Sequence, residues 1–307
     1  MEIINSIAPV FLLIVLGKIL HELHFFPDHF LEQLNRFVYY LALPALLITG
    51  TSEAEFNWST TSNMILLFVF GTLGSLIFAW IVSIFLKLPS SKAGAFIQGS
   101  FRGNGIFIGF PIIVYTMGSV AEEQAAVMLA PIVILFNLVA VAVLLKCGKL
   151  DESKNRPFVF LIEHLFTNPM IVSCLIGLFF NFINFNLPKM IFRPMDALGA
   201  AALPLILISI GASLDIKGLK ETAAPTIIAS VIKITIPPLI GLLLVGFFDL
   251  TPIEKMITLI FLGVPTAGTA YVLAEALGCD GPLSGRIVAL STLLSAFTLP
   301  WLVAVGM

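Results

Sequence analysis

The chain has 307 residues, of which 59% are hydrophobic and only 11% are charged, and its formal net charge is −2. Soluble domains are about 45–50% apolar and about 25% charged, so this composition excludes an ordinary water-soluble protein. Nucleic acid is excluded as a partner because the sequence contains no long basic run.

Apolar stretches of membrane-spanning length recur along the whole chain. A hydrocarbon core of about 30 Å is crossed by about 20 helical residues. The sequence therefore predicts an all-α integral membrane protein with ten transmembrane helices, numbered as spans one to ten. Spans one to five are residues 3–21, 29–49, 61–86, 93–117 and 123–147. Spans six to ten are residues 168–185, 194–214, 222–248, 253–277 and 282–305.

A polar stretch separates the two groups of spans. Residues 148–167 are predicted to form a cytoplasmic loop, in which residues 157–166 are a candidate interfacial helix. Lys and Arg in short loops are retained on the cytoplasmic side. With both termini outside, nine basic loop residues are cytoplasmic and three are external. This bias predicts a multi-pass protein of the cell membrane with both termini outside.

The sequence repeats weakly at an offset of 160 residues. Pro9 and Gly17 recur as Pro169 and Gly177, and Ala42-Leu43-Pro44 recurs as Ala202-Leu203-Pro204. Residues 1–147 are thus a predicted first five-helix repeat, and residues 168–307 a second. Because five is odd, the second repeat enters the bilayer from the opposite side. Inverted repeats are typical of secondary transporters, which bind substrate near the midplane on broken helices.

Spans four and nine each contain residues that interrupt a helix. Span four reads Arg-Gly-Asn-Gly-Ile-Phe-Ile-Gly-Phe-Pro at residues 102–111, and span nine reads Gly-Val-Pro-Thr-Ala-Gly-Thr at residues 263–269. Inside a helix, glycine costs about 1 kcal/mol and proline about 3 kcal/mol relative to alanine. Both spans are predicted to break, leaving half-helix N-termini to face an anion and freed carbonyls to face a cation. The alternative is that these glycines only permit close helix packing.

Four motifs in this order resemble the auxin efflux carrier family over the whole chain. They are the Asn-Gly-Ile-Phe-Ile-Gly-Phe-Pro run at 104–111, Lys-Ile-Thr-Ile-Pro at 233–237, Val-Pro at 264–265, and Ser-Thr-Leu-Leu-Ser-Ala-Phe-Thr-Leu-Pro at 291–300. The resemblance, to a bacterial-type member, implies two inverted five-helix repeats in which helices four and nine cross at their breaks. It also implies a relationship in fold to the bile acid:sodium symporters.

The resemblance also implies an organisation and a cargo. Helices one, two, six and seven would form a scaffold, helices three to five and eight to ten a mobile transport domain, and the scaffold a homodimer. Bacterial relatives include proteins described as malonate or malate carriers. Asn104 matches the family's crossover asparagine, whose amide would bind a substrate carboxylate, and Pro265 matches the crossover proline. Gly103 departs from the plant pattern, which has proline there.

Ionisable residues within spans are functional candidates, because each costs roughly 2.5–3.5 kcal/mol at the bilayer centre. Lys233 lies inside span eight; it neutralises a carboxylate, stabilises the helix ends in place of a cation, or is paired permanently. Arg102 either steers an anion or extends to the interface. Glu275, near the end of span nine, is a weaker candidate for ion coupling.

Uncharged polar residues complete the candidate site. Thr266 and Thr269 flank the break in span nine, and Asn137 lies within span five. The predicted substrate-binding residues are Arg102, Asn104, Gly105, Asn137, Lys233, Pro265, Thr266 and Thr269. No catalytic residue, cofactor or metal site is predicted, and the coupling ion is left open between Na⁺ and H⁺.

These patterns predict an alternating-access, elevator-like secondary transporter of a small organic anion such as a mono- or dicarboxylate. Within the same class, the alternative is a sodium-coupled symporter of a larger amphipathic anion of the bile-acid type. Outside that class, the rivals are a membrane-embedded enzyme and a receptor or channel. The enzyme is disfavoured because the sequence contains neither a His-Glu-x-x-His motif nor a phosphate-binding loop.

Overall fold

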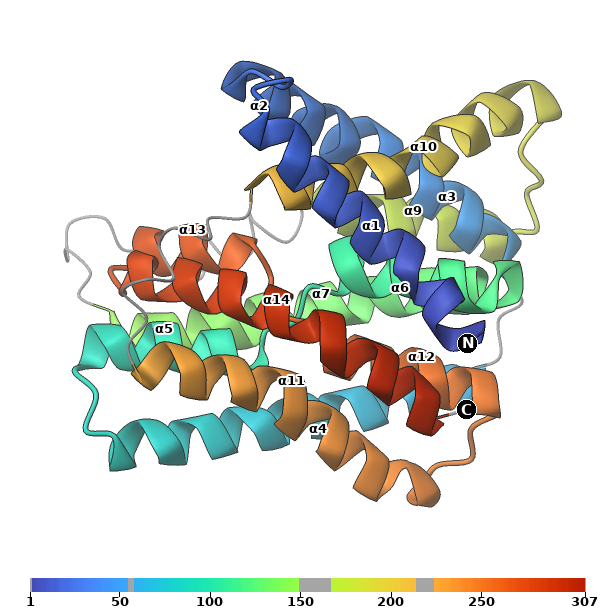
Figure 1. The fold of residues 1–307 in the computed structure, drawn as a ribbon. Coiled ribbons are helices and arrows are strands. Elements are labelled where there is room, and N and C mark those ends of the chain that lie inside the picture. The colour runs from blue at the N-terminus through green and yellow to red at the C-terminus, as the bar shows by residue number, and fades with distance from the viewer. Residues whose placement is uncertain (1, 55–57, 149–166, 214–223, 307) are drawn as a thin grey trace. The chain divides into compact units, whose positions relative to one another are not determined.

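The computed structural model describes residues 2–54, 58–148, 167–213 and 224–306. Over these ranges the chain is helical, apart from turns and one isolated antiparallel bridge (Figure 1). Helical residues lie within each of the ten predicted spans, so the all-α prediction is confirmed for this part of the chain. The predicted interfacial helix at residues 157–166, and nearly all of the loop that contains it, lie outside the described residues.

Among the residues that the structure describes, five helices are long and apolar enough to cross a membrane. They are Ser59–Phe85, Val120–Cys147, Lys189–Ser213, Ala224–Phe247 and Gly281–Val305, and Gly105–Met117 and Pro169–Phe182 are shorter apolar helices. The chain is therefore a multi-pass membrane protein by the length and composition of its helices. The inverted arrangement of ten helices stays a prediction.

The chain divides into two compact units. Unit 1 comprises Met1–Thr61, Ile106–Pro131 and Phe166–Leu214. Its helices are α1 (Glu2–Glu22), α2 (Asp28–Phe37), η1 (Val38–Ala42), α3 (Leu43–Glu53), α6 (Phe110–Met117), α9 (Pro169–Phe182), α10 (Lys189–Ser213) and the first part of α7 (Ser119–Cys147). Within unit 1, α1 packs along α10 and α3 packs along α9 (Figure 1).

Two glycines allow these helix pairs in unit 1 to approach closely. A Cβ atom on Gly17 of α1 would collide with the main-chain carbonyl of Ile208 in α10. A Cβ atom on Gly177 of α9 would lie 2.8 Å from the main-chain oxygen of Ile48 in α3. Positions 17 and 48 are each 160 residues before positions 177 and 208. The glycine of the first repeat thus packs on the isoleucine of the second, and the equivalent glycine of the second repeat packs on the equivalent isoleucine of the first. This symmetry supports the predicted internal repeat.

Unit 2 comprises Ser62–Gly105, Ile132–Leu165 and Asp215–Met307. Its helices are α4 (Trp58–Phe85), α5 (Ser90–Phe101), α11 (Ala224–Leu244), η5 (Val245–Phe247), α12 (Pro252–Gly263), α13 (Thr269–Ala276), α14 (Gly281–Gly306) and the second part of α7. Helix α11 packs against α5, α12 and α14 (Figure 1). Gly71 and Gly74 bring α4 against Leu262 of α12 and Ile240 of α11. Small residues at such contacts are typical of helix packing in membranes.

The structure differs from the predicted spans in two local respects. Spans two and four contain the π-helical segments η1 (Val38–Ala42) and η2 (Gly105–Gly109), each ending two residues before a proline, Pro44 and Pro111. Proline cannot donate the regular main-chain hydrogen bond, and a wider turn accommodates that loss. Span seven begins at Lys189 rather than at residue 194. Its charged Lys189 and Arg193 suggested a loop, but long basic side chains are tolerated in a helix at the membrane edge.

The three cysteines are buried free thiols, and one of them supports a chemical prediction. Cys279 lies in the turn between α13 and α14, where burial, Cys147 and Asp280 together raise the pKa of its thiol from 9.0 to about 11. At pH 7.5 this lowers the reactive thiolate fraction about a hundredfold. We expect iodoacetamide to leave Cys279 almost unlabelled in the native protein, as measured by peptide mass spectrometry. Labelling should be near complete after denaturation; equal labelling in both states would contradict this environment.

Candidate functional site

The predicted breaks are present in both spans. Helix α5 ends at Phe101, and Arg102 is extended with φ −74° and ψ 106° before η2 begins at Gly105. Helix α12 ends at Gly263, and Val264 is extended with φ −62° and ψ 150°. A residue that precedes proline is disfavoured in the helical region, which explains the conformation of Val264 before Pro265. The break in span nine ends where α13 begins, at Thr269.

The two breaks meet and form hydrogen bonds with each other. The main-chain N–H of Asn104 donates to the carbonyl of Pro265 at 2.8 Å, and the N–H of Ala267 donates to the carbonyl of Arg102 at 3.1 Å. Between these bonds, Gly103 and Thr266 form the isolated antiparallel bridge. Main-chain groups that leave a helix inside a membrane must find new partners, and here each break supplies partners for the other.

Side chains satisfy the carbonyls at the ends of the half-helices α5 and α12. The last carbonyls of a helix have no partner within it. In α5, the Thr266 hydroxyl donates to the Gly99 carbonyl at 2.6 Å, and the Ser75 hydroxyl donates to the Ser100 carbonyl at 3.0 Å. In α12, Lys233 Nζ donates to the Leu262 carbonyl at 2.9 Å. Both C-terminal ends at the crossover are therefore capped by residues distant in the sequence.

Lys233 is the most deeply buried charged side chain at the crossover. It lies on α11 and is 1% exposed. A Cβ atom on Gly103 would lie 2.8 Å from Val264 Cγ2, so the glycine allows the two breaks to approach closely, and 3.4 Å from the Lys233 Cε and Nζ atoms. Within the described ranges, no carboxylate lies within 4.0 Å of Lys233 Nζ. A cation at a helix C-terminus is stabilised by the partial negative charge there, roughly −0.5.

Arg102 and Asn137, which are separate candidates in the sequence, are brought together. The Nη2 group of Arg102 donates to Asn137 Oδ1 at 2.9 Å, and the arginine is only 7% exposed. With the Gln98 amide oriented by its hydrogen bonds, its oxygen accepts from Arg102 Nη1 at 2.9 Å. The guanidinium is held inside unit 2, so the alternative in which Arg102 extends to the membrane interface is wrong.

The remaining predicted site residues fall into a buried and an exposed group. Asn104 is 7% exposed and directly precedes η2, and a Cβ atom on Gly105 would lie at an ordinary contact distance of 3.4 Å from Phe261. Thr269 and Glu275 both lie on exposed positions of α13. Glu275 lies one turn after Tyr271 on the exposed side of α13, and among the described residues no hydrogen bond joins it to the buried crossover residues.

The structure corrects two expectations about how the breaks present polar groups. We expected the freed carbonyls to face a ligand, but those of Arg102 and Pro265 accept hydrogen bonds from the opposite break. We also expected Thr266 to contact substrate, but its side chain is 0% exposed and caps α5, while its N–H donates to Ser291 Oγ at 3.1 Å. Thr266 therefore positions the crossover.

Two supporting residues were not among the predicted site residues. Gln98 lies beside Arg102, and Ser291 of α14 accepts the hydrogen bond from the Thr266 N–H. Their sequence signal was a polar side chain in an otherwise apolar span, and many residues share that signal. Only long-range packing distinguishes these two from polar residues that merely bond within their own helix.

The chain is similar to known proteins over nearly its whole length. Residues 2–303 match the family model described as "Membrane transport protein". A protein of Rhizobium meliloti named "Putative malonate transporter" is 30% identical, over 97% of this chain and 93% of that protein. An uncharacterized transporter of Methanothermobacter thermautotrophicus is 26% identical over 96% of each chain. Another from Methanocaldococcus jannaschii is 24% identical over 93% of each chain.

Proposed function

Because the chain belongs to the membrane transport protein family, that of the auxin efflux carriers, we propose that it is a secondary transporter of a small organic anion. The family and the relatives' names indicate a transporter rather than an enzyme. The observation that most supports an anionic cargo is Lys233, whose buried ammonium group lies at the meeting of the two broken helices. A mono- or dicarboxylate is the proposed cargo class, and the similarity to the Rhizobium meliloti protein adds support.

Charge at the crossover favours an anion over a cation or a neutral solute. The C-terminus of α12 contributes roughly −0.5 charge, which offsets only part of the +1 of a protonated Lys233. Buried charge in a membrane is costly unless it is compensated, and a bound carboxylate supplies the compensation. At an effective dielectric constant of about 20, opposite charges 4 Å apart attract by about 4 kcal/mol.

The proposed binding groups lie where a helix resumes after each break, at the start of η2 and of α13. Asn104 directly precedes η2, and Thr269 is the first residue of α13, so both lie at helix N-termini where an anion is stabilised. The Asn104 amide donates to the substrate carboxylate in this scheme. Gly105 lets the main chain approach the substrate, and Pro265 and Thr266 keep the crossover in place.

Arg102, Asn137 and Lys233 are proposed to act mainly by holding the crossover and supplying positive potential. The side chains of Arg102 and Asn137 bond to each other, and Lys233 bonds to the α12 end. Electrostatic attraction does not require direct contact, because it decays slowly in a medium of low dielectric constant. These residues would therefore attract the cargo while Asn104 and Thr269 bind it.

Alternating access is proposed to follow an elevator-like movement of a transport domain against a scaffold. Spans three to five and eight to ten would form the transport domain. Spans one, two, six and seven would form the scaffold, and the scaffold would form a homodimer. Both termini are proposed to lie outside the cell membrane, as the distribution of Lys and Arg predicts. Glu275, at an exposed position of α13, is proposed as the residue for proton coupling.

Uptake of radiolabelled malonate into proteoliposomes tests this proposal. Replacing Asn104 with alanine should reduce uptake about tenfold or more, because a hydrogen bond to a charged group contributes about 1.5–3 kcal/mol. Asn63→Ala is a matched control: its amide donates to the Asp249 carbonyl at 3.2 Å at the edge of unit 2. Full uptake by Asn104→Ala would refute the binding role. Failure of every mono- and dicarboxylate to compete with labelled malonate would refute the proposed cargo class.

The bile-acid alternative makes a different prediction in the same vesicles. A sodium-coupled symporter would transport a steroid carboxylate and would need a sodium gradient. We instead expect uptake of the small carboxylate to change less than about twofold when choline replaces sodium, because the Lys233 ammonium already stabilises the α12 end where a metal cation would bind. Sodium-dependent uptake of the steroid anion would favour the alternative.

A further inference from the structure

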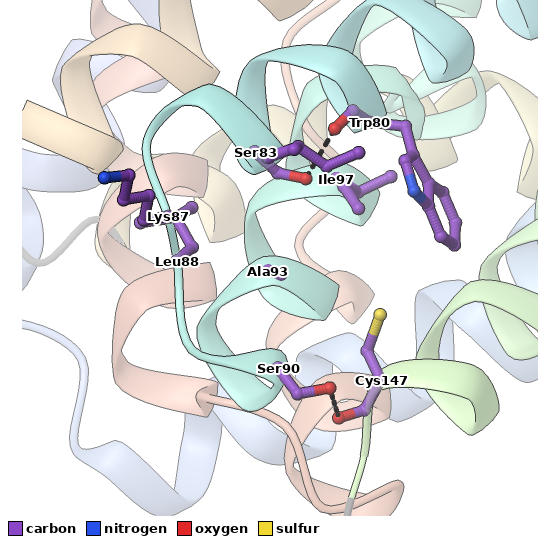
Figure 2. A pocket seen from close by; sticks show the side chains of 9 residues that line it. Trp80, Ser83, Lys87, Leu88, Ser90, Ala93, Ile97 and Cys147 are labelled. Atoms are coloured by element: carbon purple, nitrogen blue, oxygen red, sulfur yellow. Dashed lines mark hydrogen bonds between the residues drawn. The ribbon is translucent and has the colours of Figure 1, made fainter.

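A cavity of about 430 Å³ lies in unit 2, where α4, α5 and α7 come together (Figure 2). Its apolar wall includes Trp80 and Ile84 of α4 and Ile97 of α5, and its polar lining includes Lys87 and Ser90. The Ser90 hydroxyl donates to the carbonyl of Cys147 at 2.8 Å and joins the start of α5 to the end of α7. No residue of the crossover lines this cavity.

An apolar stripe on α4 leads along the helix to the cavity. Ile77, Ile81 and Ile84 recur at intervals of three and four residues, so they share one face of the helix, and Ile84 is 66% exposed. Trp80 lies on the same face and lines the cavity. Lys87 follows two residues after α4 ends at Phe85 and lines the same cavity. A hydrocarbon chain that lay along the stripe would reach the cavity that Lys87 lines.

One basic side chain, Lys87, lines the cavity, and a second, Lys146, lies beside Trp80. Lys87 lies on the side of the cavity opposite Trp80 (Figure 2), and Lys146 Nζ lies 4.8 Å from the centre of the Trp80 ring. Among the residues that the structure describes, neither lysine has a carboxylate within 4.0 Å. The carboxylate of Asp280, which follows α13, accepts the Leu283 N–H at 2.8 Å and so caps α14. Neither Lys87 nor Lys146 is therefore paired with Asp280.

We propose that this cavity binds an anionic phospholipid, with the phosphate at Lys87 and an acyl chain along the α4 stripe. Basic pockets between transmembrane helices recognise anionic head groups, and Trp is typical of the membrane–water interface. The predicted topology places this end of α4 on the cytoplasmic side, where Lys and Arg are enriched. The inference does not depend on which substrate the protein transports.

Native mass spectrometry of the full chain in detergent, with equimolar phosphatidylglycerol and phosphatidylcholine, tests the proposal. The wild type should retain phosphatidylglycerol in preference. Lys87→Gln should lower the ratio of bound phosphatidylglycerol to phosphatidylcholine about fivefold, the equivalent of about 1 kcal/mol for one lysine near a membrane surface. Lys92→Gln is the matched control, because Lys92 is exposed on the adjacent turn of α5 and does not line the cavity.

Two further measurements keep the result decisive. Thermal unfolding in phosphatidylcholine alone should be the same for wild type, Lys87→Gln and Lys92→Gln, which separates lost lipid binding from misfolding. Phosphatidylglycerol should raise the melting temperature of the wild type, and millimolar inorganic phosphate should not reproduce that stabilisation. Equal retention of the two lipids, an equal effect of Lys92→Gln, or full stabilisation by free phosphate would each overturn the proposal.

Discussion

Replacing Lys233 with methionine is expected to reduce malonate uptake at least tenfold while leaving the protein folded in the membrane. Methionine nearly matches lysine in length but has no charge and donates no hydrogen bond. The substitution removes the bond from Nζ to the Leu262 carbonyl, and bonds to charged groups contribute about 1.5–3 kcal/mol. It also removes the positive potential that attracts the carboxylate. Both losses affect the crossover directly.

The same substitution has a compensating effect on stability. A lysine at the bilayer centre costs roughly 2.5–3.5 kcal/mol on insertion scales, and methionine removes that cost. The melting temperature should therefore change little, whereas uptake falls. Ser230→Ala is the control: Ser230 is buried one turn earlier on α11, and its hydroxyl makes only a long 3.4 Å contact with the Ile287 carbonyl. Normal uptake by Lys233→Met would show that the ammonium group has no part in transport.

The second large effect concerns stability, because Gly17→Ala and Gly177→Ala are each expected to destabilise unit 1 by about 3 kcal/mol or more. The new methyl group would meet the main chain of Ile208 in one case and of Ile48 in the other. Overpacking against side chains costs about 1–3 kcal/mol, and a packed helix backbone yields less readily than a side chain. The gain in helix propensity, about 1 kcal/mol, is too small to offset this cost.

Melting curves followed by intrinsic fluorescence in detergent would measure both variants beside Gly268→Ala. A Cβ atom on Gly268 has no neighbour within 4 Å, so that variant should melt like the wild type. Similar losses at Gly17 and Gly177 would support the internal repeat, because the two glycines occupy equivalent positions. A wild-type melting temperature for either variant would mean that the helices separate easily at that contact.

Both helix breaks were predictable because their causes are local. Pro265 removes a main-chain donor and forces Val264 out of the helical region, and the glycines around Asn104 weaken the helix in span four. The π-helical turns before Pro44 and Pro111 arise from the same chemistry, yet they were missed. A proline indicates that a helix is disturbed, but packing decides whether the helix widens, bends or ends.

The membrane class, the residue ranges of most helices and the two breaks could be predicted from the amino-acid sequence. Each of these depends on the hydropathy, length or backbone preference of residues that are neighbours in the chain. Which polar groups meet could not be predicted in this way. Thr266 caps a carbonyl 167 residues away, Arg102 bonds a residue 35 positions away, and Lys233 bonds a carbonyl 29 positions away. Partners at such separations are selected by the packing of whole helices, so the polarity of a residue shows that it needs a partner without showing which partner it has.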